Sequence, residues 1–532
     1  MRERYDAVVV GGGHNGLVCA AYLARGGLRS LVLERRHVLG GAAVTEEVFP
    51  GFRFSVASYV VSLLRPEIIR ELELPRHGLE ILPLDGTFTP LDGDYLWRVN
   101  DHGRTMRELR RWSSADAEAY EEYGQLMADM ARFIKPILSV VPPDPGRLDP
   151  RPWLPVVRLA RRFRDLPERH QATFVQLMTM SAGDFLGQWF DTDPLKATIA
   201  ASGIIGTFQG IRSPGTAYVL LHHYMGEIDG AFRAWGIPKG GTGGVSAAIA
   251  SAARAAGAEV RAASPVARIE TKGGRAVGVV LESGEEIAAG AVVSSADVRR
   301  TMIDLLEPGT LPAEYEREVR RYKFRGSSGK VNLALEGLPH FTAAPDSGST
   351  EHLRGAISFS PSVDYMERAY DDAKYGRFSR HPYIDMIIPT LVDPSMAPPG
   401  KHVVSCFVQW APYYLAEGEP DWDHQREAFG DAVVDTIAER APDIRSLILH
   451  RQVLTPLDLE RELGLTEGNI FQGELSLEQL FFSRPVPGWA RFRTPVDGLW
   501  LCGSSTHPGG GIMGASGKIA AQELLRERQR AA

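Results

Sequence analysis

Cysteine is scarce in this sequence, and its placement excludes several kinds of site. Cys19, Cys406 and Cys502 are the only cysteines among 532 residues, and they lie far apart. No C-x-x-C pair is present, so the sequence has neither the ligand spacing of a zinc ribbon nor a redox-active dithiol. We therefore expect no metal site and no disulfide chemistry. The low cysteine content fits a reducing cytoplasm.

Long apolar runs and an excess of positive charge are also missing. No stretch approaches the roughly 18 uninterrupted apolar residues that a membrane-spanning helix needs. The first expected strand begins at Ala7, which leaves no room for a signal peptide ahead of it. The net charge of −7 argues against nucleic acid as the main partner. These absences predict a cytoplasmic protein with no transmembrane segment and no nucleic acid partner.

A nucleotide-binding pattern stands near the beginning of the chain. Ala7–Val10 is a short, β-branched apolar run typical of a buried strand. Gly11, Gly13 and Gly16 follow it at G-x-G-x-x-G spacing. The first glycine allows a tight turn, the second lets the backbone approach a pyrophosphate, and the third lets helix and strand pack closely. The following helix directs free N–H groups and a positive dipole end at that phosphate.

The next elements strengthen this interpretation. Residues 17–25 have helical character and are followed by two glycines, and Ser30–Leu33 is a second apolar run that ends on Glu34. A carboxylate at this place accepts hydrogen bonds from an adenosine ribose. Strand, glycines, helix, strand and acid in this order predict a dinucleotide site.

Glycines cluster again in three places further along. Gly40 and Gly41 follow Glu34 after a short loop, where the backbone is expected to pass close to the cofactor. Residues 498–502 form an expected strand that runs into a glycine-rich segment and a last helix, which makes a second anion or carbonyl-oxygen site. Glycines are also frequent in residues 238–244, but residues 236–239, where the strand of a second fingerprint would lie, do not have the pattern of a buried strand. We therefore expect a single dinucleotide site.

The rest of the chain has a different pattern of expected strands and helices. Residues 114–134 read as a helix capped by Ser114, and strands are expected at 330–335, 384–389 and 402–410. These parts lack the strand–helix–strand rhythm of the beginning and are assigned to a second domain.

The glycine-rich segments together resemble a known family. The chain is similar to the two-dinucleotide-fold FAD oxidoreductases of the phytoene-desaturase and amine-oxidase superfamily. Within it, the chain most resembles the phytoene-desaturase-related pyridine nucleotide-disulfide oxidoreductase domain group, subtype two. The resemblance spans essentially the whole chain, and its most specific segments are residues 12–17, 34–45, 221–223 and 501–515.

This resemblance implies an α/β fold, α+β overall, in which a discontinuous Rossmann-like FAD-binding domain surrounds a mixed α+β substrate domain. The FAD-binding domain would comprise residues 1–75, 235–310 and 485–532, and the substrate domain residues 76–234 and 311–484. Non-covalent FAD is the implied cofactor. Its implied contacts are Gly11, Gly13, Gly16, Glu34, Arg36, Gly40, Gly41, Val266, Gly503, Ile512, Met513, Gly514 and Ala515.

Four positions bear on this cofactor assignment. Ala42 stands where many superfamily members carry Arg, and Ser504 where many flavoproteins carry Asp, so each substitution would weaken cofactor affinity. Cys502 precedes Gly503 in a strand and is expected in the core rather than in a covalent flavin link. A side chain at Gly514 is expected to enter the space of the flavin ring.

The resemblance implies hydride transfer from a small apolar organic substrate to flavin N5, in a dehydrogenase or desaturase of the phytoene dehydrogenase type. A flavin-dependent redox-neutral isomerase and a non-enzymatic FAD-binding interaction protein remain as alternatives. No residue stands out as a catalytic base. His223, Tyr224, Glu474 and His507 are candidates because they lie in family-like segments, although a structural role is the more usual one for such residues.

Residues 155–166 are amphipathic, with several arginines on one side and apolar residues on the other. Such a helix either lies on an anionic membrane surface or packs its apolar side into the core, and the second is the more common arrangement. A peripheral membrane contact is therefore left open.

Overall fold

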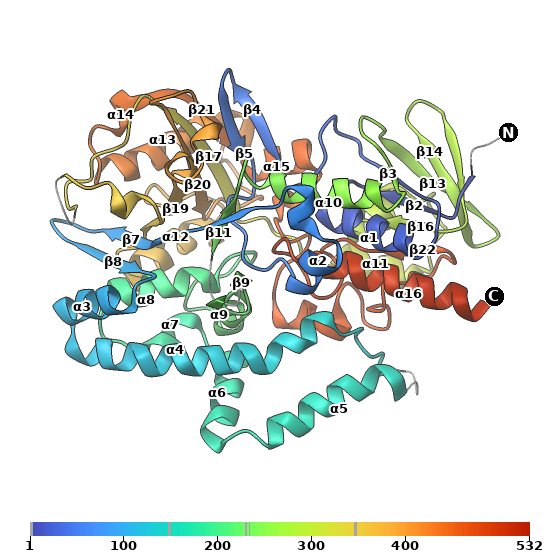
Figure 1. Ribbon diagram of the computed structural model, residues 1–532, viewed down its shortest axis with the longest axis horizontal. Coiled ribbons are helices and arrows are strands. Elements are labelled where there is room, and N and C mark those ends of the chain that lie inside the picture. Colours follow the sequence, from blue (N-terminus) through green and yellow to red (C-terminus); the bar gives the residue numbers. More distant parts are fainter. Residues whose placement is uncertain (1–3, 147–149, 229–230, 233–234, 345–347, 532) are drawn as a thin grey trace.

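The computed structural model describes residues 4–146, 150–228, 231–232, 235–344 and 348–531. The fold is α/β and has two lobes, each built around its own sheet, and both ends of the chain lie in the same lobe (Figure 1). No helix within these described ranges is long and apolar enough to cross a membrane.

The lobe that holds the chain ends is built on a five-stranded parallel sheet. Its strands pair in the order β12-β3-β2-β16-β22. They come from three distant parts of the chain: β2 (Ala7–Val10), β3 (Ser30–Leu33), β12 (Glu259–Arg261), β16 (Val292–Ser294) and β22 (Leu499–Leu501). A mainly antiparallel sheet lies beside it: β1 (Arg4–Tyr5), β13 (Val266–Lys272), β14 (Arg275–Leu281) and β15 (Glu286–Ala289).

Three helices pack together in this lobe: α1 (His14–Arg25), α10 (Gly243–Ala255) and α16 (Ala515–Ala531). The first contacts both others. Close approach depends on glycine: a Cβ on Gly16 would lie 2.2 Å from the Gly11 carbonyl oxygen, and one on Gly517 would lie 2.1 Å from that of Asn15. The C-terminal helix is therefore fitted directly against the first helix of the nucleotide fold.

The other lobe contains a seven-stranded mixed sheet in the order β21-β17-β20-β19-β18-β7-β8. Its strands are β7 (Gly86–Pro90), β8 (Tyr95–Val99), β17 (Ser328–Leu335), β18 (Ala356–Phe359), β19 (Tyr383–Ile387), β20 (His402–Gln409) and β21 (Ile448–Leu454). One face packs on α13 (Trp422–Ala438), where Val331, Leu333, Val404 and Phe429 share a core.

Helices cover the opposite face of this sheet (Figure 1). Residues Tyr383, Ile387 and Phe407 of that face belong to the same core as α4, α7, α8 and α9. These helices follow one another along the chain: α3 (His102–Trp112), α4 (Ser114–Ile134), α5 (Pro150–Arg164), α6 (Glu168–Thr179), α7 (Ala182–Gly187), α8 (Asp193–Ala200) and α9 (Thr216–Tyr224). The sheet is thus buried on both sides.

Smaller elements complete the molecule. They are β4 (Thr45–Phe49), β5 (Phe52–Ser55), α2 (Pro66–Glu71), β6 (Ile81–Pro83), β11 (Gly236–Pro238), α11 (Ala313–Arg321), α12 (Val363–Lys374), α14 (Ile444–Leu447) and α15 (Pro456–Leu463).

Two local expectations are wrong. Helix α4 has the expected bounds, but its N-cap is Ser113, whose hydroxyl accepts the Asp116 N–H. Residues Gly236–Pro238 do form a buried strand, β11, which pairs antiparallel with β6. Proline is tolerated at position 238 because it is the last residue of β11, beyond the bridge that Gly236 makes to Val61 on the other edge of this strand. Since β11 lies outside the parallel sheet, the glycines that follow it do not close a second nucleotide fold.

Candidate functional site: a cofactor cavity and a substrate cavity

A cavity of about 310 Å³ lies where β2 and β3 end, and we call it the cofactor cavity. Its wall comes from residues near 10–15, 33–42, 265–305 and 463–472, together with Ser504. In parallel sheets ligands bind outside the carboxyl ends of the strands, which is where this cavity lies.

Helix α1 directs its N-terminus at this cavity. Gly13 is the N-cap, no side chain caps the helix, and its first turn holds no acid. The leading N–H groups are therefore available to an anion. A Cβ built on Gly13 meets nothing closer than Ser295 Oγ at 3.8 Å, so the backbone here borders open space. This geometry matches the approach to a pyrophosphate.

Glu34 is held in place by the backbone. The Gly12 N–H donates to Glu34 Oε2 at 2.8 Å, and the Arg36 N–H donates to Oε1 at 2.9 Å. Each carboxylate oxygen keeps a second lone pair for another donor. The carboxylate lines the cavity, so it can accept ribose hydroxyls.

Several buried polar atoms on this wall make no hydrogen bond to the described chain. They are His14 Nε2, Asn15 Oδ1, Arg36 Nη1, Arg300 Nε and Gln472 Oε1. Buried polar atoms are nearly always bonded in native proteins. Their gathering around one cavity indicates a polar ligand, and the residues present therefore fit a dinucleotide such as FAD.

The structure brings together about half of the predicted cofactor contacts. Those that line the cofactor cavity are Gly11, Gly13, Glu34, Arg36, Gly40, Gly41 and Val266. Gly16 and Gly503 lie behind the wall, where Gly503 packs against the Ser295 carbonyl. Ile512, Met513, Gly514 and Ala515 are not among the lining residues, and their flavin contacts stay a prediction.

The expectation for a side chain at Gly514 is wrong. A Cβ there would lie 2.9 Å from Ile68 Cδ1 and 3.2 Å from Val18 Cγ2, so it points into the core behind the cavity. Gly514 has a φ of +71°, which is the conformation that favours glycine. The glycine is required by packing and backbone shape.

Arg484 was not anticipated from the sequence. Its fully buried guanidinium donates to the carbonyls of five residues: Phe471, Gly473, Glu474, Gln479 and Ser504. It thereby ties the loop at 471–479 to the turn that follows β22. Gln472 and Ser504, two wall residues of the cofactor cavity, are positioned by this one side chain.

The two departures from the superfamily pattern both lie on the wall. Ser504 Oγ accepts a hydrogen bond from Asn15 Nδ2 at 3.1 Å, and Ala42 leaves Arg36 and Arg300 as nearby cations. Cys502 is fully buried and is in contact with Cys19 in the core, away from the cavity wall. Its position gives no route to a covalent flavin link.

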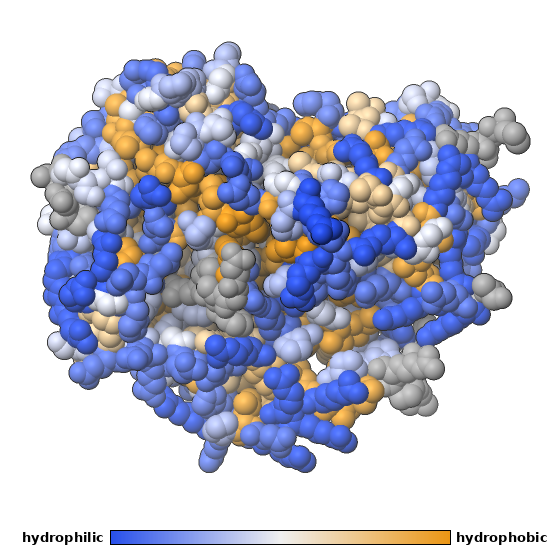
Figure 2. Space-filling model, in the orientation of Figure 1, coloured by the Kyte–Doolittle hydropathy of each residue, from blue (hydrophilic) through white to orange (hydrophobic). Residues whose placement is uncertain are grey.

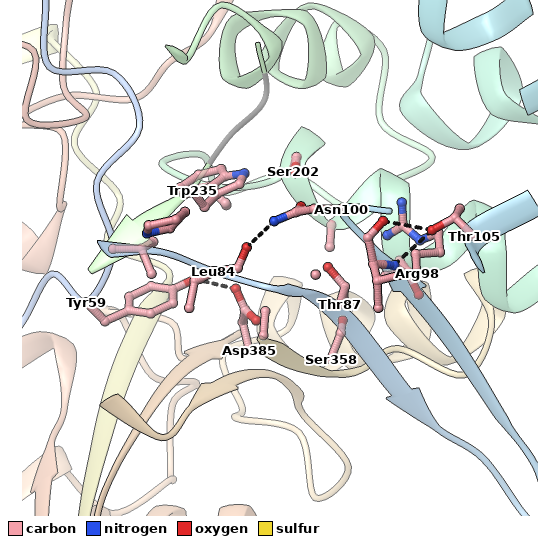
Figure 3. A pocket seen from close by; sticks show the side chains of 18 of the residues that line it. Tyr59, Leu84, Thr87, Arg98, Asn100, Thr105, Ser202, Trp235, Ser358 and Asp385 are labelled. Carbon is pink, nitrogen blue, oxygen red and sulfur yellow. Dashed lines mark hydrogen bonds between the residues drawn. The ribbon is translucent and has the colours of Figure 1, made fainter. Parts of the chain in front are cut away.

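A second cavity, of about 340 Å³, lies on the helix-covered face of the seven-stranded sheet, and we call it the substrate cavity (Figure 3). Its lining mixes rings such as Tyr59 and Trp235 with polar groups such as Arg98, Asn100 and Asp385.

Strand register explains the polar floor of this cavity. Asp385 of β19 and Ser358 of β18 are paired and line the cavity, and beyond the lining the row continues from Asp385 through Phe407 of β20 to Lys330 of β17. On the far side Thr87 of β7 pairs with Arg98 of β8. Cross-strand partners share a face of the sheet. A row of polar side chains therefore crosses a face that is buried beneath helices.

Tyr59 lies over this row. Its hydroxyl donates to Asp385 Oδ2 at 2.5 Å, its ring stacks on Phe407, and Lys330 Nζ lies 4.7 Å from the ring centre. Burial raises the pKa of the Asp385 carboxyl to about 6, and the charge of Lys330 opposes this rise. Burial also lowers the pKa of the Lys330 ammonium to about 7. Both groups titrate near neutral pH, as groups that transfer protons do.

Stacked rings link the two cavities. The His223 ring lies between Trp235 of the substrate cavity and Phe471, at centroid distances of 6.0 and 6.3 Å. Ile470 and Gln472, on either side of Phe471, line the cofactor cavity. These three rings therefore form an aromatic wall between the two cavities.

The four catalytic candidates from the sequence line neither cavity. Burial lowers the pKa of the His223 and His507 imidazoles to about 4, and their ring nitrogens meet the carbonyls of Val219 and Ile137. Glu474 is bound by Arg325, while Tyr224 packs against Tyr123. Their contacts are those of structural residues.

Sequence reasoning missed Tyr59, Lys330 and Asp385. The available signal was polar residues at alternate positions of otherwise apolar strands, as in Lys330 and Asn332 of β17. Such alternation normally marks a solvent-facing side. Only the helices folded over that face make these groups buried.

These features define a dinucleotide-binding oxidoreductase fold. The chain belongs to the flavin containing amine oxidoreductase family, whose sequence profile matches residues 16–525. It is an FAD-dependent oxidoreductase.

Individual relatives are similar to this chain over nearly its whole length. The rat pyridine nucleotide-disulfide oxidoreductase domain-containing protein 2 is 41% identical, with 99% of this chain and 94% of the rat protein covered. A limonene dehydrogenase subunit from Castellaniella defragrans is 28% identical, with 99% and 95% covered. A crystal structure of an oxidoreductase from Methanosarcina mazei shares the fold, with a TM-score of 0.61, 17% identity and 98% and 99% covered. The resemblance drawn from the sequence is confirmed.

Proposed function

We propose that this protein removes a hydride from a carbon atom of an organic substrate held in the substrate cavity, as a dehydrogenase or desaturase does. When bound, FAD supplies the hydride acceptor at its N5 atom. The observation that carries the proposal is the pairing of Tyr59 and Asp385 at the end of the substrate cavity that faces the shared aromatic wall.

The chain's own residues have distinct tasks in this proposal. Asp385 accepts the proton that accompanies hydride loss, because its raised pKa keeps it a usable base near neutral pH. Tyr59 orients that carboxylate through its hydroxyl. Lys330 supports the ionised carboxylate by its charge. The helices over the sheet bury Tyr59 and Lys330.

A substrate with an apolar body fits this cavity. Tyr59, Leu84, Ile205 and Trp235 offer apolar surface along its lining. One relative is named as part of a limonene dehydrogenase, and limonene is a hydrocarbon. We therefore propose a small, largely apolar substrate and a phytoene dehydrogenase-like reaction.

Anaerobic mixing of the FAD-loaded protein with candidate lipophilic compounds tests this function. A substrate is expected to bleach the yellow absorbance and to leave a product with one more double bond. Product rearrangement without net bleaching would assign an isomerase instead. Absence of any turnover with a wide panel would favour a binding role.

A further inference from the structure

We infer that the end of the substrate cavity away from the aromatic wall binds a carboxylate of the substrate, and that Arg98 is the group that holds it. The inference rests on the proposed function, because it names a feature of the substrate for that same cavity. It refines the apolar expectation: the substrate has an apolar body and an anionic head.

Arg98 is a buried cation with no acidic partner among the described residues. Only 6% of it is exposed, and it lines the cavity from β8. Its Nη1 donates to the Tyr120 hydroxyl at 3.4 Å, while its Nε is buried with no hydrogen bond to the part of the chain that the structure describes. A buried arginine is normally paired, because an uncompensated buried charge is costly.

Arginines near Arg98 in the sequence are paired with carboxylates. Arg104 donates to both oxygens of Glu351, and Arg111 bonds Asp94 and Glu108. Both are exposed to solvent, where a partner matters least. Arg98 is more buried than either and lines the cavity, yet no carboxylate of the described residues pairs with it.

The register of the sheet sets the geometry of the bound molecule. Arg98 lies on β8 and Asp385 on β19, three strands apart, which corresponds to about 14 Å between their backbones. Figure 3 shows Arg98 and Tyr59 at opposite ends of the cavity, with Thr87 and Ser358 between them. A guanidinium at one end and a carboxylate at the other favour a substrate with a single anionic head, because a second anion would meet Asp385.

A carboxylate suits this end better than a phosphate. Among the described lining residues Arg98 is the only Arg or Lys. One guanidinium presents two parallel donors that match the two oxygens of a carboxylate. A buried phosphate dianion would need further positive charge.

Calorimetric titration of the FAD-loaded protein tests the inference, because bound FAD keeps the probes out of the pyrophosphate cradle. The probes are hexanoate, hexanamide and hexylphosphonate. Wild type is expected to bind hexanoate at least tenfold more tightly than hexanamide. The variant Arg98→Gln is expected to lose this preference, Arg98→Lys to keep part of it, and the matched control Arg104→Gln to keep all of it.

Equal binding of hexanoate and hexanamide by wild type would overturn the inference even if Arg98→Gln fails to fold. A preference that survives in Arg98→Gln would also overturn it, and tighter binding of hexylphosphonate would assign a phosphate head instead. Bleaching of the flavin absorbance by candidate substrates is measured in a separate experiment. Arg98-dependent hexanoate binding in a protein that no compound bleaches would keep the anion site and reject the oxidoreductase proposal for this cavity.

Discussion

At the scale of single residues, we expect Glu34 to recognise the adenosine half of the cofactor. Its two oxygens accept the N–H groups of Gly12 and Arg36 and still face the cavity. In Glu34→Gln an amide NH₂ replaces one of these acceptors and faces a donor. Loss of a charge-assisted hydrogen bond of about 1.5–3 kcal/mol predicts FAD binding at least about tenfold weaker, measured by quenching of FAD fluorescence.

The matched control is Glu80→Gln, since Glu80 makes an exposed ion pair with Lys239 on the surface. Its FAD affinity should equal that of wild type. If Glu34→Gln also binds FAD normally, this carboxylate is no cofactor ligand.

The pKa values of Asp385 and Lys330 predict in which direction the rate of flavin reduction changes with pH. Asp385 has a pKa of about 6, so the rate of flavin reduction should rise as the pH passes upward through 6. Lys330 lowers that pKa by its charge, so Lys330→Met should move the rise to higher pH. Asp385→Asn should remove the rise.

Anaerobic stopped-flow reduction across pH 5 to 9 measures these profiles. A shift to lower pH in Lys330→Met, or an unchanged profile in Asp385→Asn, would show that another group accepts the proton.

At the scale of elements, helix α5 presents a face that is both basic and apolar. Leu154 and Val157 are 51% and 42% exposed, and Arg158 and Arg161 lie on the same side of the helix. Phe163 packs against Phe133 and Phe174, so the opposite side joins the body. Figure 2 shows orange and blue atoms intermixed in this region. One side of the helix therefore packs into the body as expected, and contact of the exposed side with a membrane stays a prediction.

This face predicts peripheral binding to anionic membranes. Wild type should float with vesicles that contain anionic lipid, and the variant with Arg158, Arg161 and Arg162 changed to Ser should remain at the bottom of the gradient. The control changes Arg317, Arg320 and Arg321 of α11 to Ser; these arginines form ion pairs with glutamates of the same helix, and the variant should float like wild type. Equal flotation of the two triple variants, or none for wild type, would remove the membrane role.

The two cavities differ in how much of each can be predicted from the sequence. The nucleotide fingerprint is local, since strand, glycines, helix and acid follow within about thirty residues and each has its own physical task, so its site was predictable. The floor of the substrate cavity depends on pairing between strands that lie up to several hundred residues apart. Lys330 and Asp385 lie in one row only because β20 pairs with both of their strands, and no local pattern encodes that register.

At the scale of the whole molecule, the sheet of each lobe borders one of the two cavities. One sheet is parallel and presents its strand ends to the cofactor cavity, while the other presents a polar face to the substrate cavity. The discontinuous course of the chain is visible in the parallel sheet, whose strands come from three separate segments. The exact division into residues 1–75, 235–310 and 485–532 against the remainder stays a prediction, because β6 and β11 pair across it.

The central claim is that FAD occupies the cofactor cavity at the N-terminus of helix α1, and Gly13→Val tests it most directly. Gly13 has a φ of −70°, which any residue adopts, and its Cβ position borders open cavity. Valine therefore fits the fold but fills the cradle of the pyrophosphate. The control is Gly187→Val, whose Cβ position is open and exposed on α7.

The measurement is the amount of flavin released by denaturation per folded chain, identified by mass spectrometry. Wild type and Gly187→Val are expected to release one unmodified FAD per chain. Gly13→Val is expected to release almost none while keeping the circular dichroism of wild type. Full FAD occupancy in folded Gly13→Val would contradict the account.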